Sequence, residues 1–381
     1  MQPKQAKKNK EMDILGQTHI QLILFFIFYG ITGVVPLIAA LYLLLRRGNA
    51  IAPGVKPPLR LRRWTASFFL VAALAHVWWI LFYIYSGDLQ SMNYLVLAMV
   101  DCVLLFVTFA GMLLAMLQDR RRPVWPALVT MIPFVALCGA AMAFPSKLME
   151  QITAVYLVLL ILLFTVHMVV AIRHYGRWLN DNYADLENKK VWLCQAVALV
   201  SMLLFVLYVF ATDMVMIWLI HIIELVLVGL LLWRVETLPK LAENIVESSQ
   251  SDPLTLSPSN PFTSTIDLEQ IDRLLKEHCV ATQLYLQHDL SLQDLAQAIG
   301  TNRSYLSQYF SRKSITYNTY INNLRIDYFI KRYQELTAAR QAVVAQELAY
   351  ESGFSSYRTF SRAFTQRMGQ SVTAWMGQST E

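Results

Sequence analysis

Seven long apolar segments constrain the fold of this 381-residue chain more than any other feature. Each is about 20 residues or longer, the length at which a helix crosses roughly 30 Å of hydrocarbon. Because lipid leaves backbone groups no water to bond, helices are the expected structure. A hydrophobic content of 56% is also too high for an ordinary soluble protein. The segments cover residues 20–45, 64–85, 94–117, 124–144, 152–172, 191–211 and 214–233.

Lysine and arginine residues are concentrated in alternate loops between these segments. Lys147 is the only lysine or arginine in the intervening loops. Because basic loops stay in the cytoplasm, the odd-numbered loops and the chain after the seventh segment are predicted to be cytoplasmic. The same topology puts the Lys-rich residues 1–17 outside, and six spans with a re-entrant first segment is the alternative count. The basic residues of the odd-numbered loops are Arg46, Arg47, Lys56, Arg60, Arg62, Arg63, Arg120, Arg121, Arg122, Arg173, Arg177, Lys189 and Lys190.

Ionisable side chains inside the apolar segments are candidates for sensing, because burying them in lipid is costly. His221 and Glu224 are three residues apart and therefore share one helix face. A cluster of such groups could bind a ligand, a proton or a metal ion, and interhelical hydrogen bonds that fix the bundle are the other interpretation. No C-x-x-C or H-E-x-x-H motif is present, so the sequence assigns no metal site, no cofactor and no enzyme activity. The candidates are His76, Asp101, His167, His221 and Glu224.

The composition changes after residue 234 and again after residue 265. A short juxtamembrane segment leads into a stretch rich in Ser, Pro and Thr, which is typical of a flexible linker. We therefore expect four parts: a polar tail at 1–17, a transmembrane domain at 18–234, a juxtamembrane segment and linker at 235–265, and a soluble domain at 266–381.

A helix-turn-helix pattern occurs twice in the soluble domain. In each copy Leu-Ala is followed by Gly and then by two apolar residues, and the pattern recurs after about 53 residues. Small residues let two helices cross closely, and Gly ends the first helix with a positive φ. The first copy contains Leu295, Ala296, Gly300, Leu306 and Phe310, and the second contains Leu348, Ala349, Gly353, Phe360 and Phe364.

This stretch resembles the DNA-binding domain of AraC-type transcription regulators. The resemblance lies in LSLQDLAQAIGTNRSYLSQYFSRK, in YNTYINNLRIDYFIKRY and in ELAYESGFSSYRTFSRAFTQRMG, and covers roughly residues 266–376. It implies an all-α domain in which a long helix holds two helix-turn-helix units at a fixed separation. One monomer would then enter two successive major-groove segments.

The outward faces of the two recognition helices are the predicted DNA contacts. Ser291, Asn302 and Ser356 are expected N-caps, and Tyr305, with the apolar residues of helix 303–313, is expected to face inward. In the connecting helix, about 319–333, Arg325, Lys331 and Arg332 are expected to be available for phosphates or ion pairs. The outward residues are Arg303, Ser304, Ser307, Gln308 and Arg312 in the first helix, and Tyr357, Arg358, Ser361 and Arg362 in the second.

The combined pattern predicts an all-α protein: a seven-transmembrane-helix bundle followed by the DNA-binding domain. The leading hypothesis is a bacterial inner-membrane transcription regulator with a cytoplasmic carboxyl-terminal domain, whose bundle senses an envelope or small-molecule signal. The alternatives are spans that only anchor the chain, with control by proteolysis or abundance, and a receptor module whose soluble half binds protein. The expected partners are double-stranded DNA, the lipid bilayer, an unidentified signal ligand or membrane protein, and a second copy in a homodimer.

Overall fold

The computed structural model describes residues 2–46, 48–85, 92–186, 189–209, 214–241 and 268–378. They form two compact units, one of residues 1–172 and 191–241 and the other of residues 173–190 and 242–381. We call them the membrane unit and the DNA-binding unit, after the parts that the sequence predicts. The described residues contain no β-strand, and a single antiparallel bridge joins Tyr183 and Ser291. The all-α expectation is therefore met in the described part of the chain.

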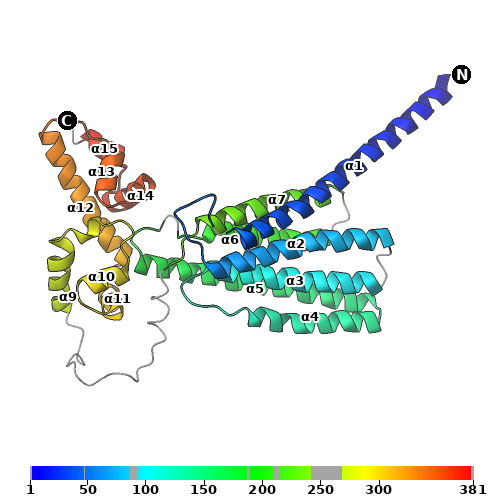
Figure 1. Cartoon of the computed structure of the whole chain (residues 1–381), viewed down its shortest axis with the longest axis horizontal. Helices are drawn as coiled ribbons and strands as arrows, with labels where there is room; N and C mark the ends of the chain where they lie inside the picture. Colours follow the sequence, from blue (N-terminus) through cyan, green and yellow to red (C-terminus); the bar gives the residue numbers. More distant parts are fainter. Residues whose placement is uncertain are drawn as a thin grey trace. The chain divides into compact units, whose positions relative to one another are not determined.

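The membrane unit is a bundle of long helices (Figure 1). Among the described residues, six helices are long and apolar enough to cross a membrane. The α6 helix lies within the sixth predicted span, and its described apolar stretch, Trp192–Leu203, leaves the count of seven spans a prediction. The helices are α1 (Gln2–Leu45), α2 (Leu59–Tyr85), α3 (Met92–Met116), α4 (Trp125–Ala143), α5 (Lys147–Asn182), α6 (Trp192–Val209) and α7 (Met214–Thr237).

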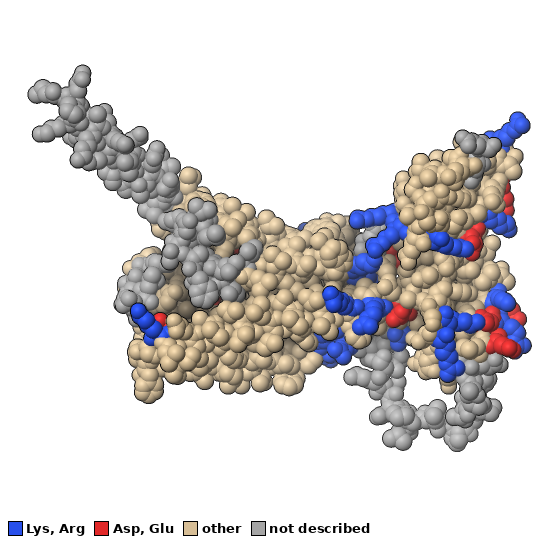
Figure 2. All heavy atoms as spheres, turned by 180° about the vertical axis from the view of Figure 1, so that it is seen from behind, with Lys and Arg blue, Asp and Glu red and all other residues tan. Residues whose placement is uncertain are grey.

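Apolar side chains cover much of the outside of these helices. Ile132 on α4 and Leu163 on α5 are 64% and 68% exposed. Figure 2 shows a nearly uncharged flank on the membrane unit, whereas Lys, Arg, Asp and Glu are frequent on the DNA-binding unit. Soluble proteins rarely expose an apolar surface of this extent, whereas lipid covers it without cost. The first predicted span, residues 20–45, lies in one continuous helix, α1, that runs through Pro36, so it does not turn back as a re-entrant segment would.

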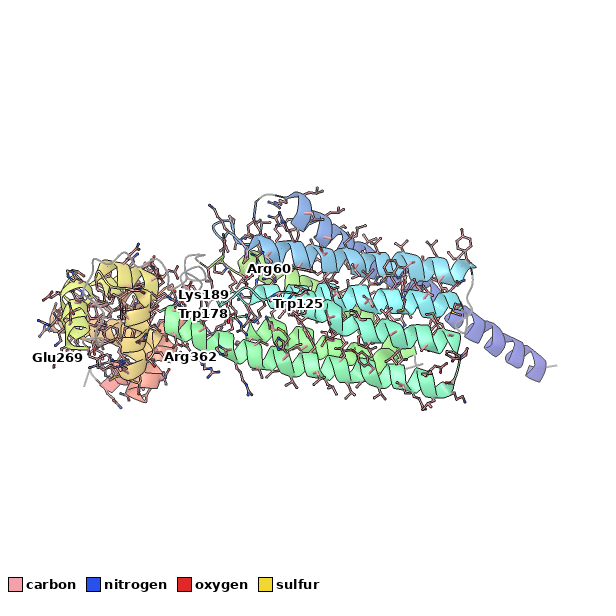
Figure 3. The ribbon with its side chains drawn as sticks, turned by 90° about the horizontal axis from the view of Figure 1, so that it is seen from below. Arg60, Trp125, Trp178, Lys189, Glu269 and Arg362 are labelled. Carbon is pink, nitrogen blue, oxygen red and sulfur yellow. The ribbon has the colours of Figure 1, made fainter. Side chains whose placement is uncertain are left out.

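The first loop, the third loop and the end of α7 lie at one end of the bundle. The Lys240 amide donates to the Lys56 carbonyl at 2.9 Å, and Gln118 donates to the Pro239 carbonyl at 3.1 Å. Arg60 and Trp125, at the beginnings of α2 and α4, lie toward the same end (Figure 3). The first and third basic loops and the end of α7 therefore share one side, as the charge pattern predicts.

The DNA-binding unit consists of two helical cores that share α12. The first core surrounds Leu295 and Leu306, and the second surrounds Phe360 and Phe364. Helix α12 contributes Ile321 to the first and Phe329 to the second, and the burial of apolar side chains on both of its halves joins the cores. The elements are α9 (Leu268–Leu275), a π-helical turn (Lys276–Val280), a 3₁₀ turn (Leu284–Leu286), α10 (Leu292–Ala298), α11 (Arg303–Arg312), α12 (Tyr317–Ala338), α13 (Ala345–Glu351), α14 (Tyr357–Met368) and α15 (Val372–Gln378).

The predicted caps begin these helices. Ser291 accepts from the Asp294 amide and forms a capping box with it. The side chains of Asn302 and Ser356 accept backbone amides at the starts of α11 and α14. Helix α12 begins two residues earlier than predicted, after Thr316, and ends at Ala338 rather than near residue 333.

The glycine turns adopt the predicted conformation. Gly300 and Gly353 have φ of 71° and 90°, in the left-handed region that favours glycine. At Gly353 a Cβ would also lie 2.7 Å from the Leu286 carbonyl oxygen, so the turn requires glycine for space as well. The predicted tail at 1–17 belongs to α1, while the linker after Leu241 lies outside the described residues.

Candidate functional site

Helix α11 presents a polar face at its surface. Ser304, Ser307, Gln308 and Arg312 are exposed as predicted, while Leu306, Tyr309 and Phe310 are buried. Tyr305 was expected to face inward, and this was wrong, because it is 41% exposed. It precedes Leu306 by one residue, a rotation of about 100°, which carries it to the edge of the apolar stripe.

Arg303, at the start of α11, is held by a segment outside the predicted domain. Its guanidinium Nε and Nη2 donate to Asn182 Oδ1 at 3.1 and 2.6 Å. Asn182 is the last residue of α5. Burial lowers the pKa of Arg303 from its usual value. Arg303 is therefore less available to DNA than its outward position in the helix predicts.

Residues 182–185 and Lys189, which we call the docking segment, pack within the DNA-binding unit. Asn318 of α12 donates to the carbonyls of Tyr183 and Ala184 at 3.1 and 2.6 Å. Tyr183 also pairs with Ser291, the cap of α10.

The docking segment also contacts the second half of the domain. The hydroxyl of Ser355, the residue before the cap of α14, donates to the Asp185 carboxylate. Lys189 forms an ion pair with Asp289 at 3.1 Å. The segment therefore reaches residues at or beside the start of both predicted recognition helices.

Helix α14 presents the second polar face. Tyr357, Arg358 and Arg362 are exposed and Ser361 is half-buried, and Figure 3 shows Arg362 on this unit. Together with Thr365 and Gln366 they line an open, shallow hollow. Neither Arg358 nor Arg362 has a carboxylate partner among the described residues.

Arg325 has a structural role, contrary to the prediction that it is available for phosphates. It is 1% exposed, and its Nε and Nη2 donate to the carbonyls of Tyr285 and Gln287 at 2.7 and 2.8 Å. Burial lowers its pKa to about 10. Arg325 lies four residues from both Ile321 and Phe329 and therefore shares their inward face. The other two cations, expected to be available for phosphates or ion pairs, form ion pairs: Lys331 and Arg332 pair with Glu335, and Arg332 also with Glu351.

Comparison with known families supports the assignment of this unit. Residues 295–378 match a family described as a helix-turn-helix domain. This segment is an AraC-type helix-turn-helix domain. The AraC-type domain is characteristic of DNA-binding transcription regulators and is not an enzyme class. No curated protein and no solved structure matches the chain.

The membrane unit brings together three of the five predicted sensing residues. His76 on α2 lies beside His221 and Glu224 on α7, with a nitrogen of each imidazole 3.6–3.7 Å from one carboxylate oxygen. Asp101 on α3 is buried and accepts a hydrogen bond from Trp79 Nε1 at 3.1 Å. His167 on α5 is exposed and does not join the cluster.

Sequence reasoning did not find the docking segment. Its residues follow a long apolar segment and look like an ordinary basic loop, so their charge predicted only the membrane topology. The short run Asn182-Tyr183-Ala184-Asp185 carries hydrogen-bonding side chains, but nothing in their spacing names the surface that they contact.

Proposed function

We propose that this protein is a membrane-bound, sequence-specific transcription regulator whose cytoplasmic domain reads two successive major-groove segments with α11 and α14. The main support is that α11 and α14 each expose a polar face. The opposite face of each helix is packed into a core, and the two cores share α12. Polar side chains at the start of such helices can reach base edges in the major groove. The proposed contacts are Arg303, Ser304, Ser307, Gln308, Arg312, Tyr357, Arg358, Ser361 and Arg362.

The docking segment holds the domain in a form with weakened DNA binding. It engages Arg303 at the start of α11 and, through Asp185, the residue before the cap of α14. Because the amino-terminal residues of recognition helices approach the bases, a segment bound there competes with DNA. Helix α5 runs without a break from Lys147 to Asn182, so the chain leads directly from an apolar helix into the docking segment.

The bundle lies in the bacterial inner membrane with the DNA-binding domain in the cytoplasm, and its polar groups detect the signal. The shared position of the basic loops and the end of α7 supports this topology. The cluster of half-buried His76, buried His221 and half-buried Glu224 supports sensing, because ionisable groups among apolar helices are costly to retain without a role.

A selection experiment with the full chain tests DNA recognition directly. The protein is placed in lipid nanodiscs and equilibrated with a pool of random duplexes, and the bound fraction is sequenced. The selected sequence should bind about 5- to 150-fold more weakly to the Arg358→Ala and Arg362→Ala variants. Arg273→Ala, which removes an exposed charge from α9, is the matched control and should bind normally. The proposal fails if no sequence is enriched and duplexes do not bind at low ionic strength.

A further inference from the structure

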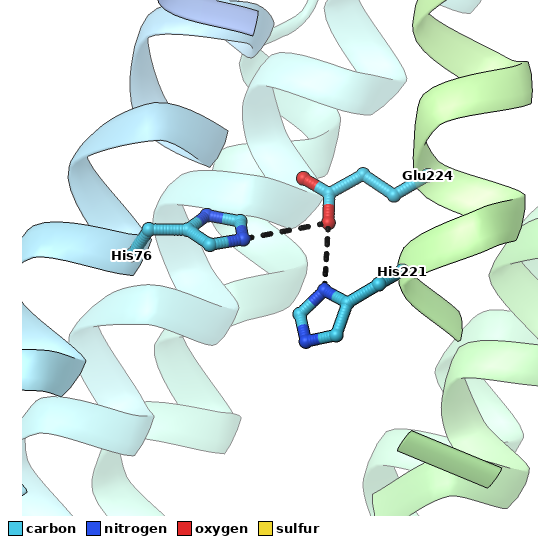
Figure 4. Close-up of side chains that lie close together, drawn as sticks. All are labelled: His76, His221 and Glu224. Atoms are coloured by element: carbon cyan, nitrogen blue, oxygen red, sulfur yellow. Dashed lines mark ion pairs between the residues drawn. The ribbon is translucent and has the colours of Figure 1, made fainter. Parts of the chain in front are cut away.

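The close approach of His76, His221 and Glu224 forms a candidate ligand set inside the membrane unit. One nitrogen of each imidazole and one oxygen of Glu224 all lie within 4.8 Å of one another. Figure 4 shows both rings directed at the same carboxylate oxygen, one from α2 and the other from α7. The two helices are far apart in the sequence, so the cluster exists only in the folded bundle.

The ring nitrogens that face Glu224 lack hydrogen bonds. His76 Nε2 and His221 Nδ1 are buried and have no hydrogen-bond partner among the described residues. Their distances to Glu224 Oε2, 3.7 and 3.6 Å, are too long for a direct hydrogen bond. Buried polar atoms are nearly always paired, and an unpaired group often marks a missing water or ion.

The contact made by Nδ1 of His76 determines which of its two ring nitrogens can bind a cation. Nδ1 lies 2.9 Å from the Ala72 carbonyl oxygen. A carbonyl only accepts, so Nδ1 carries the proton, and in the neutral ring Nε2 presents its lone pair to Glu224. Histidine ligands in metal sites are typically oriented in this way by a backbone carbonyl. Tyr29 supports the same residue, since its hydroxyl donates to the His76 carbonyl at 3.0 Å.

We propose that His76, His221 and Glu224 bind a divalent first-row transition metal, for which Zn²⁺ is the probe. Ligands about 2.0–2.1 Å from a tetrahedral zinc ion are about 3.4 Å apart. The nitrogen–oxygen separations of 3.6–3.7 Å need only a small contraction, and the two imidazole nitrogens, within 4.8 Å of each other, must also draw closer together. Two imidazoles favour such a metal over Mg²⁺ or Ca²⁺, which prefer oxygen ligands. Three protein ligands leave a fourth position for water.

The charge of the surroundings suits a divalent cation. Asp101 on α3 interacts electrostatically with both His76 and Glu224. Two carboxylates close together among apolar helices repel one another, whereas a divalent ion bound to neutral imidazoles makes the set electrically neutral. A proton shared by the two histidines and Glu224, with Asp101 as the other nearby acid, is the competing occupant, and the experiment distinguishes it from the metal.

The position of the cluster indicates the side from which the metal arrives. His76 lies in the second half of α2, and His221 and Glu224 lie in the first half of α7. With the basic loops in the cytoplasm, both positions fall in the outer half of the membrane. This step rests on the proposed function: the signal is a metal ion outside the cytoplasm. Metal binding itself does not depend on that step.

Zinc binding to the purified full chain tests the site without any DNA readout. Detergent-solubilised protein is stripped with a chelator and titrated with Zn²⁺ in a calorimeter, and the bound metal is examined by X-ray absorption. We expect one zinc per chain with histidine nitrogen and carboxylate oxygen ligands. His76→Gln, His221→Gln and Glu224→Gln should each weaken binding at least about tenfold. His167→Gln, the control in α5, should bind as the wild type does, and Mg²⁺ should not compete.

The spectrum of the wild-type protein keeps the test decisive even where a variant fails to fold. Thermal unfolding without metal checks each variant, and Zn²⁺ should raise the Tm of the wild type and of the His167 variant only. The proposal is overturned if the wild type binds no zinc, if the spectrum lacks histidine ligands, or if folded His76→Gln and His221→Gln proteins bind zinc normally. Proton uptake at the cluster without zinc binding would assign the site to a proton instead. A working metal site in a chain that fails to select DNA would refute the proposed function alone.

Discussion

Replacing Asn182 with alanine should strengthen DNA binding by the full chain. The change removes both hydrogen bonds that Arg303 donates to Asn182, at 3.1 and 2.6 Å. Hydrogen bonds to charged groups contribute roughly 1.5–3 kcal/mol. Because Arg303 regains water when it is released, we expect a net loss of about 1–2 kcal/mol from docking, a factor of roughly 5 to 30. If the docked form predominates, apparent affinity for DNA rises by up to the same factor.

Fluorescence anisotropy with the protein in nanodiscs measures this change on the selected duplex. Asn180→Ala, the same substitution two residues earlier in α5, is the control and should leave affinity unchanged. A double-mutant cycle isolates the contact, since Asn182→Ala should have little further effect in an Arg303→Ala background. Unchanged or weaker binding by Asn182→Ala, with the protein folded, would refute competition between the docking segment and DNA.

Four further predictions concern single residues. Arg358→Ala should cost about 1–3 kcal/mol in operator binding and relax preference at one base pair, as competition binding with single-base variants of the duplex would reveal. Arg325→Met should lower the free energy of unfolding by about 2–4 kcal/mol, because two buried carbonyls lose their donor. A marked fall in Tm in thermal melting would show that Arg325 acts on stability and not by direct contact with DNA. Asp272 accepts from Tyr309 and Lys313, which lowers its pKa; it therefore stabilises the fold above about pH 4 and loses that effect as the pH falls through its folded pKa. The Tm difference between wild type and Asp272→Asn should then be large at pH 7 and small near pH 3. Gly111→Val should destabilise the bundle by about 1–3 kcal/mol, because even a Cβ would lie 2.4 Å from the Trp64 ring, and lower yield with lower Tm in detergent would show it.

The helices of the DNA-binding unit were the most predictable part of the fold. Local chemistry specifies them: Ser291, Asn302 and Ser356 cap helices through their own side chains, and Gly300 and Gly353 adopt positive φ. These signals involve residues within a few positions of one another, so the sequence alone contains them.

Contacts between distant segments were not predictable in the same way. Arg325 was expected to be available for phosphates or ion pairs, but the fold brings the 284–287 turn against it and makes it a buried donor. The docking segment is a second example, because a helical period describes one face of a helix and not the segment that covers it. His76 and His221 were both candidates, yet their pairing depends on how α2 and α7 pack.

The most direct test of the central claim is chromatin pull-down sequencing of the full-length chain in living cells. Membrane-embedded wild-type protein should recover a small set of sites that share one sequence. A chain with Arg358→Ala and Arg362→Ala should lose those sites at equal abundance in the membrane fraction, whereas Arg273→Ala should keep them. Recovery of no sites above background, or of the same sites by both chains, would contradict DNA reading through α14.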